Sequence, residues 1–199
     1  MKAYVLYSGG KDSSLMAILL KRMGMEVELL TANFGVYESY IFASKAAKSL
    51  DIRHNILDLD KSILEKAVDI ILDDGFPNNG ISYLHKAVLE ELANFANKNG
   101  YSVIADGTRR DDRTPKLNKD EIRSLEDRKN IQYINLDSFG YKTIETLVSN
   151  FFKISHEESS IKNSSDYEVE IRYLIDNEKD GNSKDLFPKH YQTRVIGLK

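Results

Sequence analysis

Cysteine is absent from the 199-residue chain, which excludes disulfide bonds, cysteine-ligated zinc and iron–sulfur clusters. The same absence excludes any reaction in which this chain carries sulfur on a cysteine of its own. No apolar run approaches the length of a membrane span, and the first residues lack the apolar core of a signal peptide. We therefore expect a cytoplasmic protein without a membrane partner.

A strong excess of positive charge is also lacking, since the formal net charge is −3 and the pI about 5.9. Such a balance gives no global attraction for nucleic acid, although it leaves room for a local basic patch. What the chain does have is an ordinary globular composition, with 41% hydrophobic and 30% charged residues. This supply of apolar side chains suits one domain with one core and a small appendage.

Patterns of buried strands and amphipathic helices alternate through the first two-thirds of the chain. Because strands separated by helices form right-handed crossovers, the alternation predicts a parallel sheet with helices on both faces. We predict an α/β fold, a three-layer α/β/α sandwich around a mostly parallel five-stranded sheet. The predicted strands span residues 3–7, 27–34, 52–57, 101–105 and 131–135, and the predicted helices 12–23, 37–50, 59–72, 81–97, 119–129 and 141–152.

Polar and turn-forming stretches interrupt this pattern. The turn-rich residues 74–80 predict a loop between two helices. Residues 155–165 are polar and predict a surface loop. Residues 167–175 fit an amphipathic helix better than a strand, and the tail 187–197 ends on a predicted short strand.

The carboxyl ends of the predicted strands mark the edge at which such sheets bind ligands. The loops that follow Tyr7, Phe34 and Ala105 should therefore meet at one edge. We predict that residues 1–153 form the domain that carries this edge. Residues 154–199 are predicted to form a C-terminal extension that packs on or near it.

The loop after the first predicted strand has the composition of a phosphate site. It opens a helix, whose unpaired N–H groups and dipole favour an anion. Gly9 and Gly10 let the backbone approach a ligand closely, and Lys11 supplies a mobile positive charge. Asp12 suits a helix cap or a divalent metal, and an ordinary strand–turn–helix with a Ser or Asp cap is the alternative. The predicted binding residues are Tyr7, Ser8, Gly9, Gly10, Lys11, Asp12, Ser13 and Ser14.

Residues Ser8 to Ser13 resemble the Ser-Gly-Gly-x-Asp-Ser signature of the PP-loop superfamily. Its members are also called N-type ATP pyrophosphatases or adenine nucleotide alpha hydrolases. The resemblance covers residues 1–153 and is closest to small archaeal proteins of the alpha hydrolase type. It implies the HUP-type α/β fold, ATP and Mg²⁺ as cofactors, and cleavage of ATP to AMP and pyrophosphate with adenylation of a substrate.

A second charged segment follows the fourth predicted strand, where three carboxylates alternate with three guanidinium groups. Carboxylates can hold Mg²⁺, and arginines can clamp phosphate or stabilise charge that develops on it. A solvated turn whose charges pair with one another is the alternative. We predict that Asp106, Gly107 and Thr108 bind ATP, and that Asp12 and Asp112 hold the metal. The catalytic residues predicted from both segments are Lys11, Asp12, Arg109 and Asp112.

Further positions carry less specific signals. Asn33 and Phe34 end the second predicted strand, where the resemblance implies that the backbone reads adenine, and core packing is the alternative for Phe34. His85 is interpreted as a helix-surface or core histidine rather than a catalytic one. The tail with His190 and Arg194 fits either a lid or substrate clamp over the nucleotide or a structural strand. The predicted substrate-binding residues are Arg110, Arg113, His190 and Arg194.

Together these residues predict an enzyme, a ligase or transferase, that cleaves ATP to AMP and pyrophosphate and adenylates an unidentified acceptor. Three alternatives stay open, namely a PP-loop enzyme that modifies tRNA, a small-molecule amide or amidine ligase that obtains ammonia or an amine from elsewhere, and a nucleotide-binding sensor without turnover. The missing cysteines disfavour most thiolating enzymes, and the intact loop after the first strand favours catalysis over the sensor. ATP and the acceptor are the predicted partners, and the sequence leaves tRNA and a homodimer open.

Overall fold

A computed structural model describes residues 1–112, 116–158, 160, 163–179, 181–187 and 191–199. Strands and helices alternate from β1 to α6 except that two helices, α3 and α4, follow β3, and four further elements come after α6. The first strands are β1 Lys2–Leu6, β2 Glu26–Asn33, β3 His54–Asp58, β4 Val103–Arg109 and β5 Gln132–Leu136. The helices between and after them are α1 Lys11–Arg22, α2 Tyr40–Ser49, α3 Lys61–Asp74, α4 Asn78–Lys98, α5 Lys119–Lys129 and α6 Tyr141–Phe151. The C-terminal elements are β6 Phe152–Glu158, α7 Tyr167–Glu178, α8 Ser183–Leu186 and β7 Tyr191–Leu198.

The first five strands form one parallel sheet in the order β3-β2-β1-β4-β5. The central strand β1 pairs with β2 on one side and β4 on the other, so that Val5 lies opposite both Leu29 and Ala105. The chain winds outward in one direction from β1 to β3 and in the other from β4 to β5. This reversal creates a switch point beside β1, the place where open α/β sheets bind ligands. The predicted fold class is confirmed.

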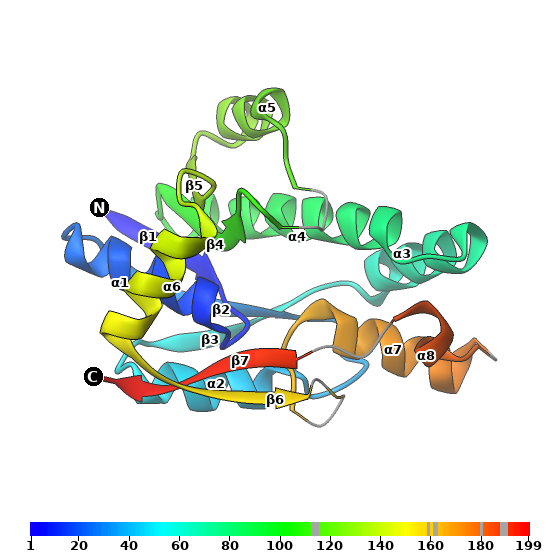
Figure 1. The fold of residues 1–199 in the computed structure, drawn as a ribbon. Coiled ribbons are helices and arrows are strands. Elements are labelled where there is room, and N and C mark those ends of the chain that lie inside the picture. The colour runs from blue at the N-terminus through cyan, green and yellow to red at the C-terminus, as the bar shows by residue number, and fades with distance from the viewer. Residues whose placement is uncertain (113–115, 159, 161–162, 180, 188–190) are drawn as a thin grey trace.

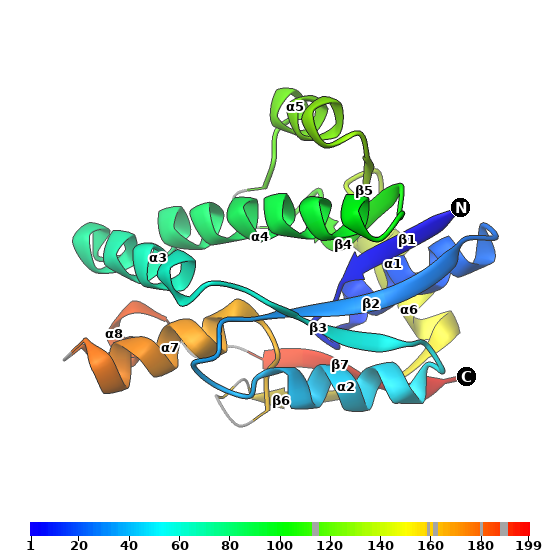
Figure 2. The same cartoon turned by 180° about the vertical axis from the view of Figure 1, so that it is seen from behind.

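Alternate side chains of each strand enter two separate cores, one on each face of the sheet. In β1, Tyr4 and Leu6 join the core under α3 and α4. Ala3 and Val5 join the core under α1, α2 and α6. Figures 1 and 2 show α3 and α4 along one side of the sheet and α2 along the other. The result is the expected three-layer α/β/α arrangement.

The C-terminal elements differ in part from the sequence prediction. Residues 155–158, predicted as surface loop, belong to β6, which pairs antiparallel with β7. The prediction was wrong because β6 obtains its hydrogen bonds from a strand distant in sequence, which local polarity does not reveal. Residues 167–175 are helical as predicted, within α7. The two-stranded β6–β7 sheet packs beside α2, as Figure 1 shows.

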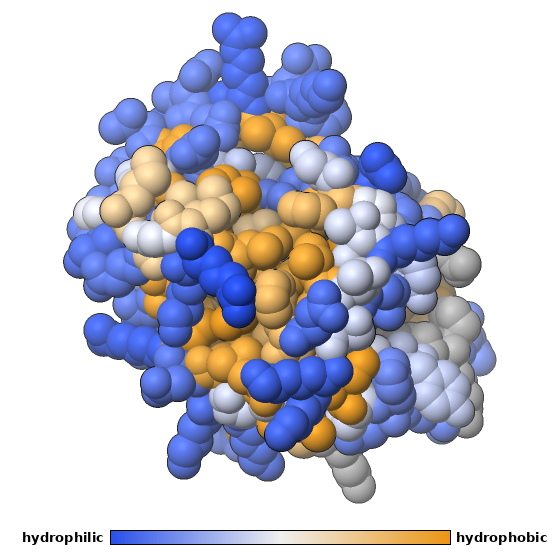
Figure 3. Space-filling model, turned by 60° about the vertical axis from the view of Figure 1, so that its left-hand side comes forward, coloured by the Kyte–Doolittle hydropathy of each residue, from blue (hydrophilic) through white to orange (hydrophobic). Residues whose placement is uncertain are grey.

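Hydrophobic side chains gather on one outer face of the molecule. Figure 3 shows this face by turning forward the side of Figure 1 on which α1 and α6 lie. Of the hydrophobic residues in or next to these two helices, Leu147 and Phe151 of α6 are only partly buried against the core, and Met23, just after α1, is 67% exposed. Such a patch suits an interface between proteins, and the homodimer stays a prediction. Among the residues that the structure describes, no helix combines the length and apolarity needed to cross a membrane.

Candidate active site

The loop between β1 and α1 has the backbone of an anion site. Gly9 adopts a left-handed φ of 76°, and a Cβ atom there would lie 3.1 Å from the Cα atom of Ala43 in α2. Gly10 is the N-cap of α1 and provides no side-chain cap, and uncapped N–H groups at the start of a helix are suited to binding an anion. The hydroxyl of Ser13 lies 3.4 Å from both the backbone nitrogen and the hydroxyl of Ser8, which folds the loop on itself.

The second charged segment meets this loop at Gly107 of β4. A Cβ atom at Gly107 would lie 2.5 Å from the backbone nitrogen of Ser13, which is closer than such atoms can approach. Only glycine therefore permits this contact between β4 and the start of α1. The loops after β1 and β4 consequently lie side by side at the carboxyl edge of the sheet.

Lys11 is held by two carboxylates. Its Nζ lies 3.1 Å from Oδ1 of Asp12 and 2.8 Å from Oε1 of Glu145 in α6. Burial alone would lower the pKa of Lys11, but the two carboxylates outweigh this effect and raise the pKa above its ordinary value. Lys11 therefore carries a positive charge, and its ammonium group can move from Glu145 to an anionic ligand.

Arg109 lies between the two aspartates that were predicted to hold a metal. Its Nε lies 3.0 Å from Oδ1 of Asp112 and 3.5 Å from Oδ2 of Asp12. Its backbone N–H also donates to Oδ2 of Asp112 at 2.7 Å. Burial raises the pKa of Asp12, and the charges of Lys11 and Arg109 oppose this rise only in part. One arginine therefore joins both predicted segments by charge.

Asp106 is a buried carboxylate of β4, only 3% exposed. It accepts hydrogen bonds from the backbone N–H of Thr108 at 2.8 Å and from the hydroxyl of Tyr133 at 2.9 Å. Nε2 of His85 lies 3.1 Å from its Oδ2, and Nδ1 of His85 lies 3.3 Å from the hydroxyl of Tyr167. Burial alone would raise the pKa of Asp106, but His85 and the Thr108 N–H outweigh it and lower the pKa.

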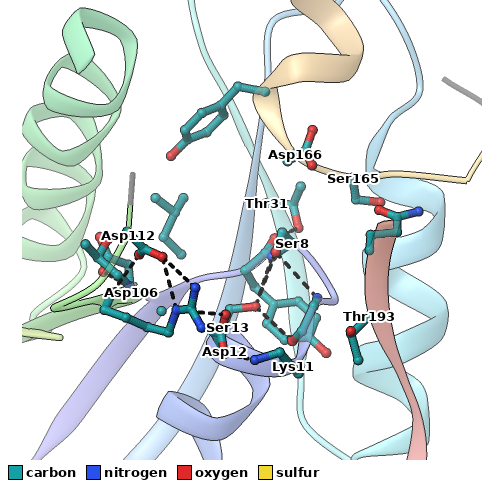
Figure 4. Close-up of a pocket in the computed structure, with 18 of the residues that line it drawn as sticks. Ser8, Lys11, Asp12, Ser13, Thr31, Asp106, Asp112, Ser165, Asp166 and Thr193 are labelled. Carbon is teal, nitrogen blue, oxygen red and sulfur yellow. Dashed lines mark hydrogen bonds and ion pairs between the residues drawn. The ribbon is translucent and has the colours of Figure 1, made fainter. Parts of the chain in front are cut away.

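These groups line a main cavity of about 460 Å³, a volume typical of small-molecule sites. Figure 4 shows Lys11, Asp12 and Asp112 on one side of it and Ser165 and Thr193 on the other. The first side, the loop wall, consists of Tyr7, Ser8, Gly10, Lys11, Asp12, Ser13, Asp106, Gly107, Thr108, Arg109 and Asp112. The opposite side, the C-terminal wall, consists of Ser165, Asp166, Tyr167, Tyr191, Gln192 and Thr193. The lining is completed by Leu6, Thr31, Ala32 and His85.

Most of the predicted site residues lie in the loop wall. Ser14 does not line the cavity but supports it, because its hydroxyl shares a 3.0 Å hydrogen bond with the hydroxyl of Tyr7. Arg110 packs against the start of α6, where a Cβ atom at Gly140 would lie 2.8 Å from its guanidinium group. The predicted residues outside the lining are Gly9, Ser14, Asn33, Phe34, Arg110 and Arg194. Those outside the described residues are Arg113 and His190.

Asn33 and Phe34 lie in the core side of the β2–α2 turn rather than in the cavity. The amide of Phe34 donates to both carboxylate oxygens of Glu170 in α7, at 3.1 and 3.2 Å. The side-chain amide of Asn33 donates to the carbonyl of Tyr37 at 2.7 Å. An adenine base that binds the Phe34 amide must therefore displace Glu170.

Arg194 reaches the site through its backbone rather than its side chain. Its backbone forms a bridge with Gly10. Its guanidinium group instead lies 4.6 Å from the centre of the Phe42 ring and donates to the carbonyl of Asn163. Arg194 thereby fixes β7 against α2 and the loop.

The residues that sequence reasoning missed are the C-terminal wall, Thr31 and His85. The hydroxyl of Thr31 donates to the carbonyl of Tyr7 at 2.6 Å, yet in the sequence Thr31 is an ordinary member of an apolar strand. His85 lines the cavity beside Asp106, whereas its helical position indicated a surface or core residue. No sequence spacing could have found these residues, because they approach the loop only in the folded chain.

The sequence matches known proteins over nearly its whole length. Residues 1–197 match a family described as "Family of unknown function (DUF7411)". "Uncharacterized protein MJ0690" of Methanocaldococcus jannaschii is 52% identical over 200 residues, which cover 100% of this chain and 97% of that protein. A 7-cyano-7-deazaguanine synthase of Staphylococcus epidermidis is 37% identical over 89 residues, which cover 39% of this chain and 39% of the synthase.

Solved structures also resemble the fold, among them the following two. The first is described as a predicted subunit of tRNA methyltransferase from Methanocaldococcus jannaschii, with a TM-score of 0.90, 50% identity, and coverage of 100% of this chain and 98% of that one. The second is the U34-tRNA thiolase NcsA of Methanococcus maripaludis with its [4Fe-4S] cluster. It has a TM-score of 0.52 and 18% identity, and the match covers 75% of this chain and 56% of NcsA. This second likeness concerns the fold alone.

Proposed function

Because the chain belongs to the family of unknown function DUF7411, and with it to the PP-loop superfamily, we propose that the main cavity binds ATP with Mg²⁺. ATP is cleaved between its α- and β-phosphates, and AMP passes to an unidentified acceptor. One observation carries the proposal. The close approach of Gly107 to Ser13 brings Lys11 and Arg109 into the lining of a single cavity, and two cations suit the charge of a reacting triphosphate.

In this proposal the loop wall holds the phosphates. The N–H groups at the start of α1, with the hydroxyl of Ser13, bind the β- and γ-phosphates. Lys11 exchanges Glu145 for a phosphate oxygen, so its charge stays compensated throughout. Arg109 stabilises the charge that develops at the α-phosphate, a role for which its position between the two segments suits it.

Asp12 and Asp112 fit the proposed role of magnesium ligands. Within the described ranges, no group of three or more histidine, cysteine, aspartate or glutamate side chains could hold a metal alone. Magnesium in nucleotide sites needs only one or two carboxylates, since phosphates and water complete its coordination. Both aspartates lie against Arg109, close to where the phosphates would bind. The bound ion would neutralise phosphate charge there.

The acceptor contacts remain proposals at Arg110, Arg113 and His190. Arg194 receives a different proposed role, because its guanidinium group is already engaged on Phe42. We propose that Arg194 holds β7 in place, so that the backbone of this strand lies against Gly10 in the loop between β1 and α1.

A second candidate function is the modification of tRNA. It is favoured by the 50% identical structure, which is described as a predicted subunit of tRNA methyltransferase. The [4Fe-4S] cluster of the thiolase NcsA has no counterpart bound through cysteine here, because this chain has no cysteine. If tRNA is the acceptor, any sulfur must come from another molecule.

Product analysis of the pure protein with Mg-ATP tests the proposal, with and without cell metabolites or total tRNA. AMP and pyrophosphate support it, ADP and phosphate contradict it, and tight ATP binding without turnover favours a sensor. Lys11→Ala should lower the rate about 100-fold, because it removes a positive charge at the phosphates. Lys21→Ala, at the exposed end of the same helix, is the matched control and should keep the wild-type rate.

A further inference from the structure

A second cavity of about 300 Å³ adjoins the main one. The two linings have in common His85, Thr108, Asp112, Asp166 and Tyr167. A ligand in the second cavity would therefore lie beside a nucleotide in the first. A complete ligase or transferase reaction needs ATP, the acceptor that it adenylates, and a nucleophile that then displaces AMP. The second cavity has a volume that suits such a small third reactant.

The side chains of the second cavity favour a ligand that donates hydrogen bonds. Acceptor oxygens line it on Thr108 and on the three carboxylates Asp112, Asp166 and Glu168. The ammonium group of Lys116, which also lines it, is held by the carbonyl of Arg109 at 2.9 Å. Arginines outside the lining pair with two of the carboxylates, Asp112 and Glu168. An amine, which brings several N–H donors, matches this lining.

A chain of three side chains between the cavities can carry a proton. The hydroxyl of Tyr167 lies 3.3 Å from Nδ1 of His85, and Nε2 of His85 lies 3.1 Å from Oδ2 of Asp106. Nε2 is buried and makes no well-aligned hydrogen bond to a described residue, so the Asp106 carboxylate acts on it by charge. This charge favours the tautomer with its proton on Nε2, which leaves Nδ1 free to accept from Tyr167.

The protonation state of Tyr167 agrees with proton transfer from its hydroxyl to Nδ1 of His85. Burial holds the pKa of Tyr167 well above its ordinary value, and the nearby charge of Asp106 raises it further. Tyr167 is therefore a protonated donor toward His85. It can give up its proton only as it receives another from a ligand.

We propose that the second cavity binds an amine nucleophile, and that Tyr167 and His85 together remove its proton during attack on the adenylate. The inference rests on the proposed function, which supplies the adenylate. A bound ammonium ion first loses one proton to water, because only the neutral amine has an electron pair for attack. The amine nitrogen then forms a bond to the adenylated carbon, the bond from that carbon to the AMP oxygen breaks, and AMP leaves with the electron pair. The proton lost by nitrogen passes to the Tyr167 oxygen, while Tyr167 gives its own proton to Nδ1. Asp106 is the positioning residue that balances the imidazolium charge.

Histidine NMR on the full chain tests this inference. The chain has four histidines, and the signal lost in His85→Gln identifies the imidazole of His85. Its nitrogen shifts should report a proton on Nε2. Methylammonium chloride, added with a non-hydrolysable ATP analogue, should shift this signal in a saturable way. Tetramethylammonium chloride has the same charge and no N–H donor, and it should leave the signal in place.

One variant separates the proton relay from a structural role of Tyr167, and a second tests amine binding in the cavity. Tyr167→Phe keeps the ring and removes the hydroxyl, so it should shift the Nδ1 signal while the far-UV circular dichroism spectrum stays that of the wild type. Glu168→Gln should weaken methylammonium binding about threefold, because an amide is a poorer acceptor for an ammonium group. Glu178→Gln, on the same helix but outside the cavity, should bind methylammonium like the wild type.

The outcomes that overturn the inference are distinct from failure of the proposed function. A proton on Nδ1 overturns the relay. No methylammonium shift, or an equal shift with tetramethylammonium, overturns the amine site. Failure of the wild type to bind the ATP analogue in calorimetry contradicts the proposed function instead, and the amine titration is then repeated without nucleotide.

Discussion

The two walls of the main cavity are built in opposite ways. The loop wall comes from two short, continuous segments and carries charges that pair between them, such as Arg109 with Asp12. The C-terminal wall is mostly hydroxyl and amide side chains, and distant partners hold it: Ser165 accepts from the backbone N–H of Ala43 at 2.9 Å. The chemistry for phosphate is thus local, whereas the shape around the ligand depends on the whole fold.

The largest effect is expected where the two segments of the loop wall meet. Gly107→Ala places a Cβ atom 2.5 Å from the Ser13 nitrogen, so the backbone must shift at a cost of about 1–3 kcal/mol. We expect ATP-analogue binding to weaken about tenfold or more in calorimetry, because the phosphate groups lose their alignment. Gly197→Ala is the control, since a Cβ atom there meets nothing within 4 Å. Equal losses in both variants would contradict a close junction at Gly107.

The second-largest effect is expected at Glu170, which is 1% exposed and holds the C-terminal segment against the β2–α2 turn. Its carboxylate accepts the backbone N–H groups of Phe34, Val36 and Tyr37 at 3.1 to 3.3 Å. Glu170→Ala leaves these groups without an acceptor and should lower the free energy of unfolding by about 2–3 kcal/mol in urea titrations. Glu178→Ala, at the exposed end of the same helix, should cost less than about 1 kcal/mol. Similar values for the two would show that Glu170 does not secure this segment.

A smaller, pH-dependent effect is expected at His54, which lies beside the loop wall. Its Nε2 lies 2.8 Å from Oγ1 of Thr31, and burial lowers its pKa from 6.5 to about 4. The unfolded chain takes up this proton at a higher pH than the folded one. Stability from His54 is therefore fully present above about pH 6.5 and is lost as the pH falls toward about 4.

We expect His54 to contribute a loss of about 1–2 kcal/mol over this range, since its partial exposure screens the effect. Urea unfolding of the wild type and of His54→Gln at a series of pH values measures it. The variant should show a shallower dependence on pH. The same slope in both proteins would remove His54 as the cause.

The smallest effect is expected at Glu145, which holds Lys11 in the loop wall. Glu145→Gln removes a competing charge 2.8 Å from Nζ, so the ATP analogue should bind about two- to fivefold more tightly. Calorimetry at low salt measures the change, and Glu157→Gln, which lies away from the main cavity in β6, serves as control. Weaker binding would mean that Glu145 positions Lys11 rather than competing for it.

The parts that the sequence predicts are those with local causes. The proposed phosphate-binding residues of the first loop are contiguous from Ser8 to Ser14, so neighbouring residues alone are enough to recognise them. The α/β fold follows from alternating periodicities that each span a few residues. Both the loop and the fold class could be predicted without knowing which segments of the chain are in contact in the folded protein.

The parts that the sequence does not predict depend on partners far along the chain. The bond between Glu170 and Phe34 joins residues 136 positions apart, and no local pattern marks either of them. Gly80 indicated a loop by its type, yet it lies within α4, where a Cβ atom would be 2.3 Å from Cγ1 of Ile71 in α3. There the missing side chain serves helix packing rather than a turn.

The pairing of β7 with the first loop also has a consequence for biosynthesis. The N–H of Val195 donates to the carbonyl of Gly9 at 3.3 Å, and Arg194 bridges Gly10. A ribosome releases residues 8–14 early and β7 much later. The part of the cavity wall that β7 supplies can therefore form only after the C-terminal residues have left the ribosome.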